Sequence, residues 1–195
     1  STTFVGVIPF SDEITSDEPL EGTDFVPYGS TLFTMLTHQL GWKGCYFDLD
    51  VFNYRAFLKN RDDMLNDNVL EITDAIKFLE SQPADSEWFA RPSADLKQFV
   101  GQVETAEDLI AFFKDAMEFS GSGCYKIAEG TDVVISEPRN LQAEWRWFVV
   151  GGKVISGSMY RYRGNLFSQR VVEQDIIDEA QSFADKWLPN QTCCM

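Results

Sequence analysis

Histidine is nearly missing from this chain, because His38 is the only one among 195 residues. A single imidazole excludes mechanisms that need two, such as the H-E-x-x-H metalloproteases and histidine-rich metal sites. A Ser-His-Asp triad would have to use His38, and no G-x-S-x-G nucleophile elbow accompanies it. The G-x-x-x-x-G-K-[ST] phosphate loop is missing as well. We interpret His38, which lies in an apolar helical pattern, as structural, so the remaining chemistry belongs to carboxylates, arginines and lysines.

Cysteines and long apolar runs are also scarce. The four cysteines, Cys45, Cys124, Cys193 and Cys194, form no C-x-x-C pair and have no partnered histidines. We therefore expect neither a disulfide framework nor a zinc site, and a reducing, cytoplasmic location. No run approaches the roughly 18 apolar residues of a membrane span, and no signal peptide is expected. An apolar fraction of 44% with 16 phenylalanines predicts a folded chain of one domain, or of two small ones sharing a core.

Charge is distributed unevenly along the chain. The formal net charge is -15, and residues 1–85 hold 15 acids against 5 bases. Residues 137–170 reverse this balance, with six bases against two acids. The bases are Arg139, Arg146, Lys153, Arg161, Arg163 and Arg170, and the acids are Glu137 and Glu144. Such a basic stretch in an acidic protein favours either an anionic ligand or a solvated face that offsets self-repulsion.

Apolar periodicity predicts alternating strands and helices. We place a domain boundary after residue 85, between a small strand–helix region (1–85) and a second region (86–195). Thr105 and Asp108 form a capping-box arrangement at a helix start. The expected strands are 3–8, 45–47, 87–92, 133–136, 145–150 and 153–162, and the expected helices are 32–40, 51–58, 70–80, 105–117 and 172–187.

Gly151 and Gly152 give the strongest hairpin signal, because two alternating segments flank them. Alternation puts a carboxylate and an arginine on one face of the first strand and large apolar side chains on the other. The two sets are Glu144, Arg146 and Phe148, and Trp145, Trp147 and Val149. In the second strand, Arg161 and Arg163 are expected on a common face. A solvated cross-strand Glu–Arg pair would contribute only about 0.2–1 kcal/mol, whereas a phosphate site uses several guanidinium forks.

Two stretches resemble signatures of the ATP-grasp superfamily. The first is W-F-A-R-P-x-x-D-x-K-x-F-x-G over residues 88–101. The second combines V-I-S-E-P over residues 134–138 with E-W-R-W-F-V-V-x-G-K-V over residues 144–154. They are most similar to the phage- and bacteria-associated clade named for two arginines and a lysine. The resemblance covers residues 86–190, and residues 1–85 are similar to the N-terminal region of that clade.

The resemblance implies an α+β nucleotide-binding fold in which ATP lies in a cleft between two lobes. By position, Arg91 and Lys97 would reach the triphosphate, with Lys126 as a weaker candidate for a second nucleotide lysine. Ser136 and Glu137 would form the hinge whose backbone reads the adenine edge. A strand-end arginine, a surface lysine or a loop carboxylate remains the structural alternative at each of these positions.

The resemblance also implies ATP-dependent ligation, in which ATP phosphorylates a carboxylate and an amine or thiol attacks the acyl phosphate. Arg146, Arg161 and Arg163 would neutralise phosphate and acyl-phosphate charge, and Glu144 would orient an arginine or help to hold magnesium. The substrates would include ATP and a carboxylate–amine pair, with a peptide or protein as one candidate. Membrane and nucleic-acid partners are not expected, and a phage-encoded member would act in the host cytoplasm.

The C-terminus departs from the family pattern. Members bind magnesium through an Asp and then a Glu–Asn pair on strands after the last helix, and this chain stops at Met195. We therefore expect a C-terminally incomplete ATP-grasp region without its metal ligands, either shortened or naturally lacking them. An alternative function is a non-catalytic acidic protein that mimics nucleic acid or inhibits a host protein, with its acids clustered in residues 1–85.

Overall fold

The chain divides into two compact units in a computed structural model. One unit comprises Ser1–Ala56 and Asp63–Pro138, and the other comprises Phe57–Asp62 and Arg139–Met195. The described residues are 3–8, 13–44, 50–59, 61–94, 96–121, 126–170 and 173–186. The expected strand at 45–47 and the C-terminal segment at 192–195 lie outside this set. Within it, no helix is both long and apolar enough to cross a membrane.

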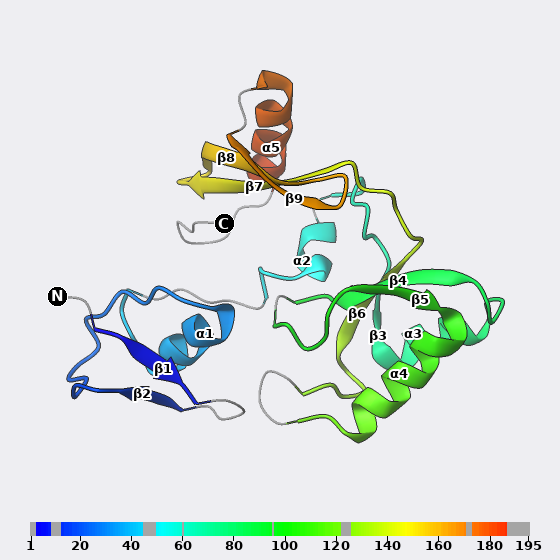
Figure 1. Cartoon of the computed structure of the whole chain (residues 1–195), viewed down its shortest axis with the longest axis horizontal. Coiled ribbons are helices and arrows are strands. Elements are labelled where there is room, and N and C mark those ends of the chain that lie inside the picture. The colour runs from blue at the N-terminus through cyan, green and yellow to red at the C-terminus, as the bar shows by residue number, and fades with distance from the viewer. Residues whose placement is uncertain are drawn as a thin grey trace. The chain divides into compact units, whose positions relative to one another are not determined.

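A two-stranded sheet and a helix form the first part of the first unit (Figure 1). Strand β1 (Val5–Val7) pairs antiparallel with β2 (Ile14–Ser16). Helix α1 (Thr31–Gln39) begins at Ser30, whose Oγ accepts a hydrogen bond from the backbone N–H of Phe33 at 3.2 Å. The helix predicted at 32–40 is thus confirmed. The expected buried strand at 3–8 is wrong in length and burial, because β1 has three residues that are only half-buried or exposed.

The second predicted helix is shorter than its sequence pattern suggests. Helix α2 covers only Tyr54–Leu58, whereas a helix was expected over 51–58. Asn53 accounts for the later start, because its Oδ1 accepts a hydrogen bond from the backbone N–H of Ala56 at 2.8 Å, as an N-terminal cap does.

A four-stranded antiparallel sheet and two helices hold the main core of the first unit. The strand order is β3 (Val69–Glu71), β6 (Asp132–Ser136), β4 (Glu87–Pro92) and β5 (Gln102–Thr105). Helices α3 (Ile72–Glu80) and α4 (Ala106–Glu118) pack against the sheet (Figure 1). The largest fully buried side chains of this core are Ile72, Leu79, Leu109, Phe113, Val133 and Ile135. Because β3 and α3 share this core with β4, residues 69–80 pack with residues beyond the boundary predicted at 85/86.

The N-terminal cap predicted for α4 at Thr105 is confirmed, although Asp108 bonds to the Thr105 hydroxyl and not to its backbone N–H. Thr105 Oγ1 accepts a hydrogen bond from the backbone N–H of Asp108 at 3.1 Å, and its hydroxyl donates to Asp108 Oδ2 at 2.6 Å. These bonds satisfy an otherwise unpaired N–H in the first turn, and the carboxylate complements the positive end of the helix dipole. Helix α4 therefore begins where its sequence predicts.

A three-stranded antiparallel sheet and one helix form the second unit (Figure 1). The strand order is β7 (Ala143–Val150), β8 (Lys153–Tyr162) and β9 (Asn165–Arg170). Gly151 and Gly152 take positive φ angles of 56° and 76°, which confirms the predicted hairpin. Strand β9 was not predicted; it follows a second tight turn at Arg163 and Gly164, whose φ angles are 47° and 76°.

Helix α5 (Gln174–Lys186) is attached to this hairpin by one glutamine. The Gln181 amide donates to the carbonyl of Gly152 at 2.8 Å and accepts from the backbone N–H of Val154 at 2.9 Å. The helix predicted at 172–187 is confirmed over its described residues. One border between the two units falls directly after Pro138.

Truncation of a core aromatic side chain provides a test of this packing. Phe113 of α4 is fully buried, so Phe113→Ala should lower the free energy of unfolding by about 3–5 kcal/mol. Urea unfolding followed by circular dichroism measures the change. The matched control is Phe119→Ala at the end of the same helix, because Phe119 is 77% exposed and should cost less than about 0.5 kcal/mol. Equal losses for the two variants would contradict the described core.

Candidate functional site

The hairpin of the second unit brings two arginines and a glutamate together. Glu144 of β7 lies directly opposite Arg161 of β8, and Arg161 Nη1 lies 3.2 Å from Glu144 Oε1. Arg146 follows two residues later on the same face of β7, and its side chain is exposed. The alternation predicted for β7 is confirmed, since Trp145, Trp147 and Val149 line a cavity against α5 on the other face.

A β-bulge adds Tyr160 to this group. Glu144 pairs with Arg161 while the next residue, Trp145, pairs with Met159, so Tyr160 is the extra residue in β8. Its hydroxyl donates to Glu144 Oε2 at 2.7 Å. The guanidinium carbon of Arg146 lies 5.3 Å from the centre of the Tyr160 ring, within range of a cation–π contact. We call Glu144, Arg146, Tyr160 and Arg161 the hairpin cluster.

Each oxygen of the Glu144 carboxylate thus has a partner, with Tyr160 on Oε2 and Arg161 on Oε1. Of the two roles expected for Glu144, the geometry matches the orientation of an arginine. Burial raises the pKa of the Tyr160 phenol, and the hydrogen bond to Glu144 and its negative charge raise this pKa further, against the opposing charges of Arg161 and Arg146. The phenol is therefore protonated at neutral pH and serves as a hydrogen-bond donor.

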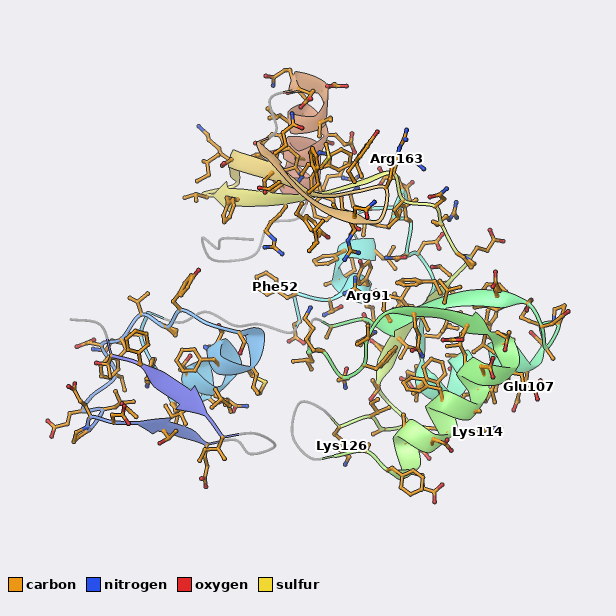
Figure 2. All side chains as sticks on the ribbon, viewed as in Figure 1. Phe52, Arg91, Glu107, Lys114, Lys126 and Arg163 are labelled. Carbon is orange, nitrogen blue, oxygen red and sulfur yellow. The ribbon has the colours of Figure 1, made fainter. Side chains whose placement is uncertain are left out.

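Arg163 lies outside the hairpin cluster, which corrects the prediction that it shares a strand face with Arg161. Strand β8 ends at Tyr162, and Arg163 occupies the left-handed region in the turn to β9. Its guanidinium carbon lies 5.2 Å from the centre of the Tyr162 ring, and its backbone N–H donates to the carbonyl of Gln142 at 2.8 Å. Arg163 is labelled in Figure 2. An alternation argument fails here because the strand stops one residue earlier.

In the first unit, a chain of side-chain hydrogen bonds joins Arg91 to Ser136. Arg91 Nη1 donates to the Tyr54 hydroxyl at 3.0 Å, and the guanidinium carbon lies 4.8 Å from the centre of the Tyr54 ring. Asn66 Nδ2 donates to the same hydroxyl at 3.1 Å, while Asn66 Oδ1 accepts from Ser136 Oγ at 3.4 Å. Arg91 and Ser136, both predicted to contact the nucleotide, are thus connected through Tyr54 and Asn66.

The two predicted lysines lie in neighbouring loops of the same unit. Gln98, next to Lys97, donates through Nε2 to the carbonyl of Lys126 at 2.7 Å. Both lysine side chains are exposed, and Lys97 takes a positive φ of 55°. Glu137, which follows β6 directly, is exposed. A cavity of about 210 Å³ lies beside the two loops. The cavity is lined by Asn53, Ser93, Ala94, Leu96, Gln98, Thr131 and Asp132.

The described part of the chain contains no cluster of potential metal ligands. No group of three or more His, Cys, Asp or Glu side chains comes together there as metal ligands. The Asp132 carboxylate, which borders the cavity, is engaged by Arg55 through Nε at 2.7 Å. The described residues therefore offer no set of three acidic side chains that would hold magnesium without help from phosphate or water.

The chain contains an ATP-grasp domain, because the model of an ATP-grasp family matches more than half of it. More narrowly, the chain belongs to ATP-grasp domain family 2 of the clade named for two arginines and a lysine, whose model matches residues 70–192. This match confirms the resemblance to the ATP-grasp superfamily and extends it toward the N-terminus, to residue 70 in β3.

Comparisons with individual proteins add only a distant likeness. No curated protein that was compared matches the chain. Among solved structures, the chain is similar to the ATP-grasp ligase PsnB in complex with a minimal precursor, with 11% sequence identity and a TM-score of 0.39. The match covers 80% of this chain and 50% of that chain, so this chain spans about half the length of that structure.

Three residues of these arrangements were missed by sequence reasoning. Tyr54 and Asn66 lie before the recognised motifs, and no spacing signal connects them with Arg91 or Ser136. Tyr160 lies next to Arg161, but regular alternation assigns the two to opposite faces. Only the bulge lets both reach Glu144.

The raised pKa of Tyr160 predicts a pH-dependent contribution to stability. The protonated phenol is favoured in the folded state, whereas an unfolded tyrosine titrates near pH 10. The contribution is therefore complete below about pH 10 and declines as the pH rises through the folded pKa. Tyr160→Phe should lower the free energy of unfolding by about 1 kcal/mol at pH 7, and the difference from the parent should shrink above pH 10. Urea unfolding over a pH series measures it.

The control for the lost hydroxyl is Tyr162→Phe on the same strand. Tyr162 is 41% exposed, so this variant should change the free energy of unfolding by less than about 0.5 kcal/mol at pH 7. A Tyr160→Phe difference that stays constant or grows above pH 10 would contradict the assignment.

Proposed function

We propose that this protein is an ATP-dependent ligase that joins a carboxylate to an amine or thiol through an acyl phosphate. Its membership of the ATP-grasp domain family supports the use of ATP. The observation that carries the proposal is the hairpin cluster, in which one carboxylate and one phenol position two guanidinium groups on a single sheet face.

The charge of Arg146 remains available to a ligand. The Glu144 carboxylate is already shared between Tyr160 and Arg161, and Arg146 forms no ion pair within the described residues. The Tyr160 ring fixes the guanidinium from one side without using its N–H donors. An arginine held in this way is suited to phosphate oxygens, which it binds through two parallel hydrogen bonds.

The proposed reaction has two balanced steps. A carboxylate oxygen of the substrate attacks the γ-phosphorus of ATP, the bond to the β,γ-bridging oxygen breaks, and ADP leaves. The amine or thiol then attacks the acyl carbon, its proton is lost, and inorganic phosphate leaves. In both steps negative charge develops on phosphoryl or acyl oxygens, and Arg146 and Arg161 would stabilise it. Glu144 and Tyr160 act as positioning residues for these arginines.

The nucleotide side of the proposal rests on the first unit. Arg91 is fixed by Tyr54, and the Ser136 side chain is fixed through Asn66, so both residues of the predicted set have defined positions. We propose that Arg91, Lys97 and Lys126 contact the phosphates and that the backbone at Ser136 and Glu137 contacts the adenine. A peptide or protein is one candidate for the carboxylate or amine substrate.

Nucleotide affinity tests the proposal. Arg146→Ala removes a charged hydrogen-bond donor and should weaken MgATP binding by about 1.5–3 kcal/mol, roughly 10- to 150-fold. Isothermal titration of the whole chain with MgATP measures the change. The matched control is Lys153→Ala, which removes one positive charge from the opposite end of the same hairpin, where Lys153 pairs with Val150. This control should change the affinity by less than about twofold.

Three outcomes would contradict the proposal. The first is that the parent chain shows no saturable MgATP binding. The second is that both variants lose the same affinity, since this would indicate a general charge effect. The third is that a basic host protein binds the chain unchanged after Arg146→Ala, without ATP turnover, as expected for an acidic mimic.

A further inference from the structure

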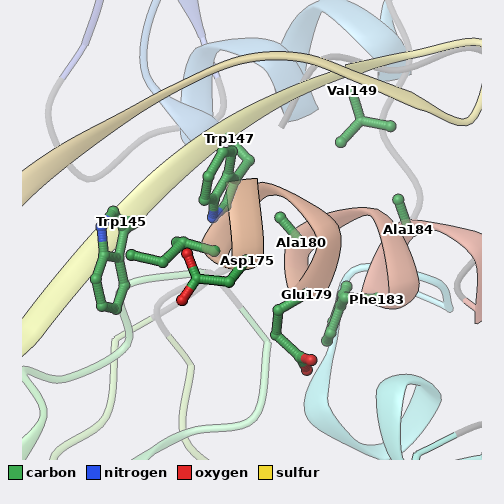
Figure 3. Close-up of a pocket in the computed structure, with 9 residues that line it drawn as sticks. Trp145, Trp147, Val149, Asp175, Glu179, Ala180, Phe183 and Ala184 are labelled. Carbon is green, nitrogen blue, oxygen red and sulfur yellow. The ribbon is translucent and has the colours of Figure 1, made fainter. Parts of the chain in front are cut away.

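The second unit contains a cavity that the proposed ligation does not use. It has a volume of about 570 Å³ and lies between β7 and α5 (Figure 3). The β7 residues that line it alternate with Glu144 and Arg146, so the cavity opens on the face of the strand opposite to the hairpin cluster. It is lined by Trp145, Trp147, Val149, Asp175, Ile176, Glu179, Ala180, Phe183 and Ala184.

The wall combines aromatic rings with carboxylates, and none of the described residues that line it is cationic. Two indole rings come from β7, and α5 supplies the Phe183 ring together with the carboxylates of Asp175 and Glu179 (Figure 3). A volume of 570 Å³ falls within the usual range of small-molecule sites, which are mostly apolar with a few polar groups. Aromatic faces and carboxylates both attract positive charge, so the chemistry of this wall selects an organic cation.

Arg61 already shows this chemistry at one end of the wall. Arg61 is only 8% exposed, and its guanidinium carbon lies 5.0 Å from the centre of the Phe183 ring. Its Nη2 lies 3.3 Å from Glu179 Oε1. The protein thus already places one cation, the Arg61 guanidinium, between an aromatic ring and a carboxylate of the wall. Because Arg61 pairs with Glu179, that carboxylate is not available to a ligand.

Asp175 is the carboxylate that remains available. It lies in the first turn of α5 and lines the cavity, and within the described residues it forms no ion pair and no side-chain hydrogen bond. In Figure 3 its carboxylate is drawn toward the end of the cavity that Trp145 and Trp147 line, away from Phe183. A positive group near Asp175 would therefore face both a carboxylate and indole rings.

We propose that this cavity binds a small amphipathic organic cation. The apolar body of the ligand occupies the space between Trp147, Ile176 and Phe183, and its ammonium or guanidinium group pairs with Asp175. The inference goes beyond the proposed ligase activity and does not rest on it, because it involves neither the hairpin cluster nor nucleotide.

Three probes with the same apolar body test this proposal by isothermal titration of the whole chain without nucleotide. They are 4-phenylbutylamine, which is a cation at pH 7, the neutral 4-phenylbutan-1-ol and the anionic 4-phenylbutyrate. The amine should bind about tenfold more tightly than the alcohol, because only the amine gains the carboxylate and ring-face attraction. The butyrate should bind more weakly than the alcohol, because Asp175 repels it.

Variants then locate the binding. Asp175→Asn should abolish the preference for the amine and leave the affinity for the alcohol within about twofold. The matched control is Asp178→Asn on the same helix, which removes an exposed carboxylate outside the cavity and should keep the tenfold preference. Ala180→Trp fills the cavity and should abolish binding of both probes, with thermal unfolding confirming that the variant is folded.

The proposal is overturned if the amine does not bind at millimolar concentration, if amine and alcohol bind equally, or if Asp178→Asn reduces the preference as much as Asp175→Asn. Because Asp175→Asn alone decides the charge effect, the test remains decisive even if Ala180→Trp does not fold. A failed MgATP titration leaves this result unaffected, so the two proposals fail separately.

Discussion

One carboxylate organises the hairpin of the second unit. Glu144 accepts a hydrogen bond from the Tyr160 hydroxyl on one oxygen and pairs with Arg161 on the other, and the Tyr160 ring in turn supports Arg146. This arrangement requires the bulge at Tyr160, since an unbroken ladder would send Tyr160 and Arg161 to opposite faces. Removal of Glu144 would leave Arg161 without its ion-pair partner and the Tyr160 hydroxyl without its acceptor, so the positions of both guanidinium groups depend on a single acidic residue.

Because side chains alternate along a strand, the two faces of β7 carry different kinds of side chain. One face presents Glu144 and Arg146 beside β8, and the other presents Trp145, Trp147 and Val149 to α5. The polar face suits phosphoryl oxygens, whereas the aromatic face with Asp175 suits a positive group. Ligands of opposite charge could therefore bind to the same strand without competing for any side chain.

Local signals in the sequence predicted much of this fold. The Gly151–Gly152 turn, the Thr105 cap and the face alternation of β7 depend on neighbouring residues, and all three are confirmed. Features that depend on long-range pairing were missed. Among the described strands, β9 pairs only with β8. No strong turn signal in the sequence before β9 predicts this strand. The contacts of Tyr54 and Asn66 with Arg91 and Ser136 join segments up to 70 residues apart, which no periodicity records.

The two irregularities in the pairing of β7 with β8 also bear on how the sheet meets other chains. Among the described strands, β7 lies at the edge of its sheet and offers unpaired backbone groups along one side. The register shifts between Glu144 and Trp145 and between Phe148 and Val149, so the ribbon is locally bent and more strongly twisted. A flat strand from another molecule would fit such an edge over only a few residues. The same bulge in β8 that assembles the cationic cluster thus makes the β7–β8 ribbon a poor template for a flat partner strand.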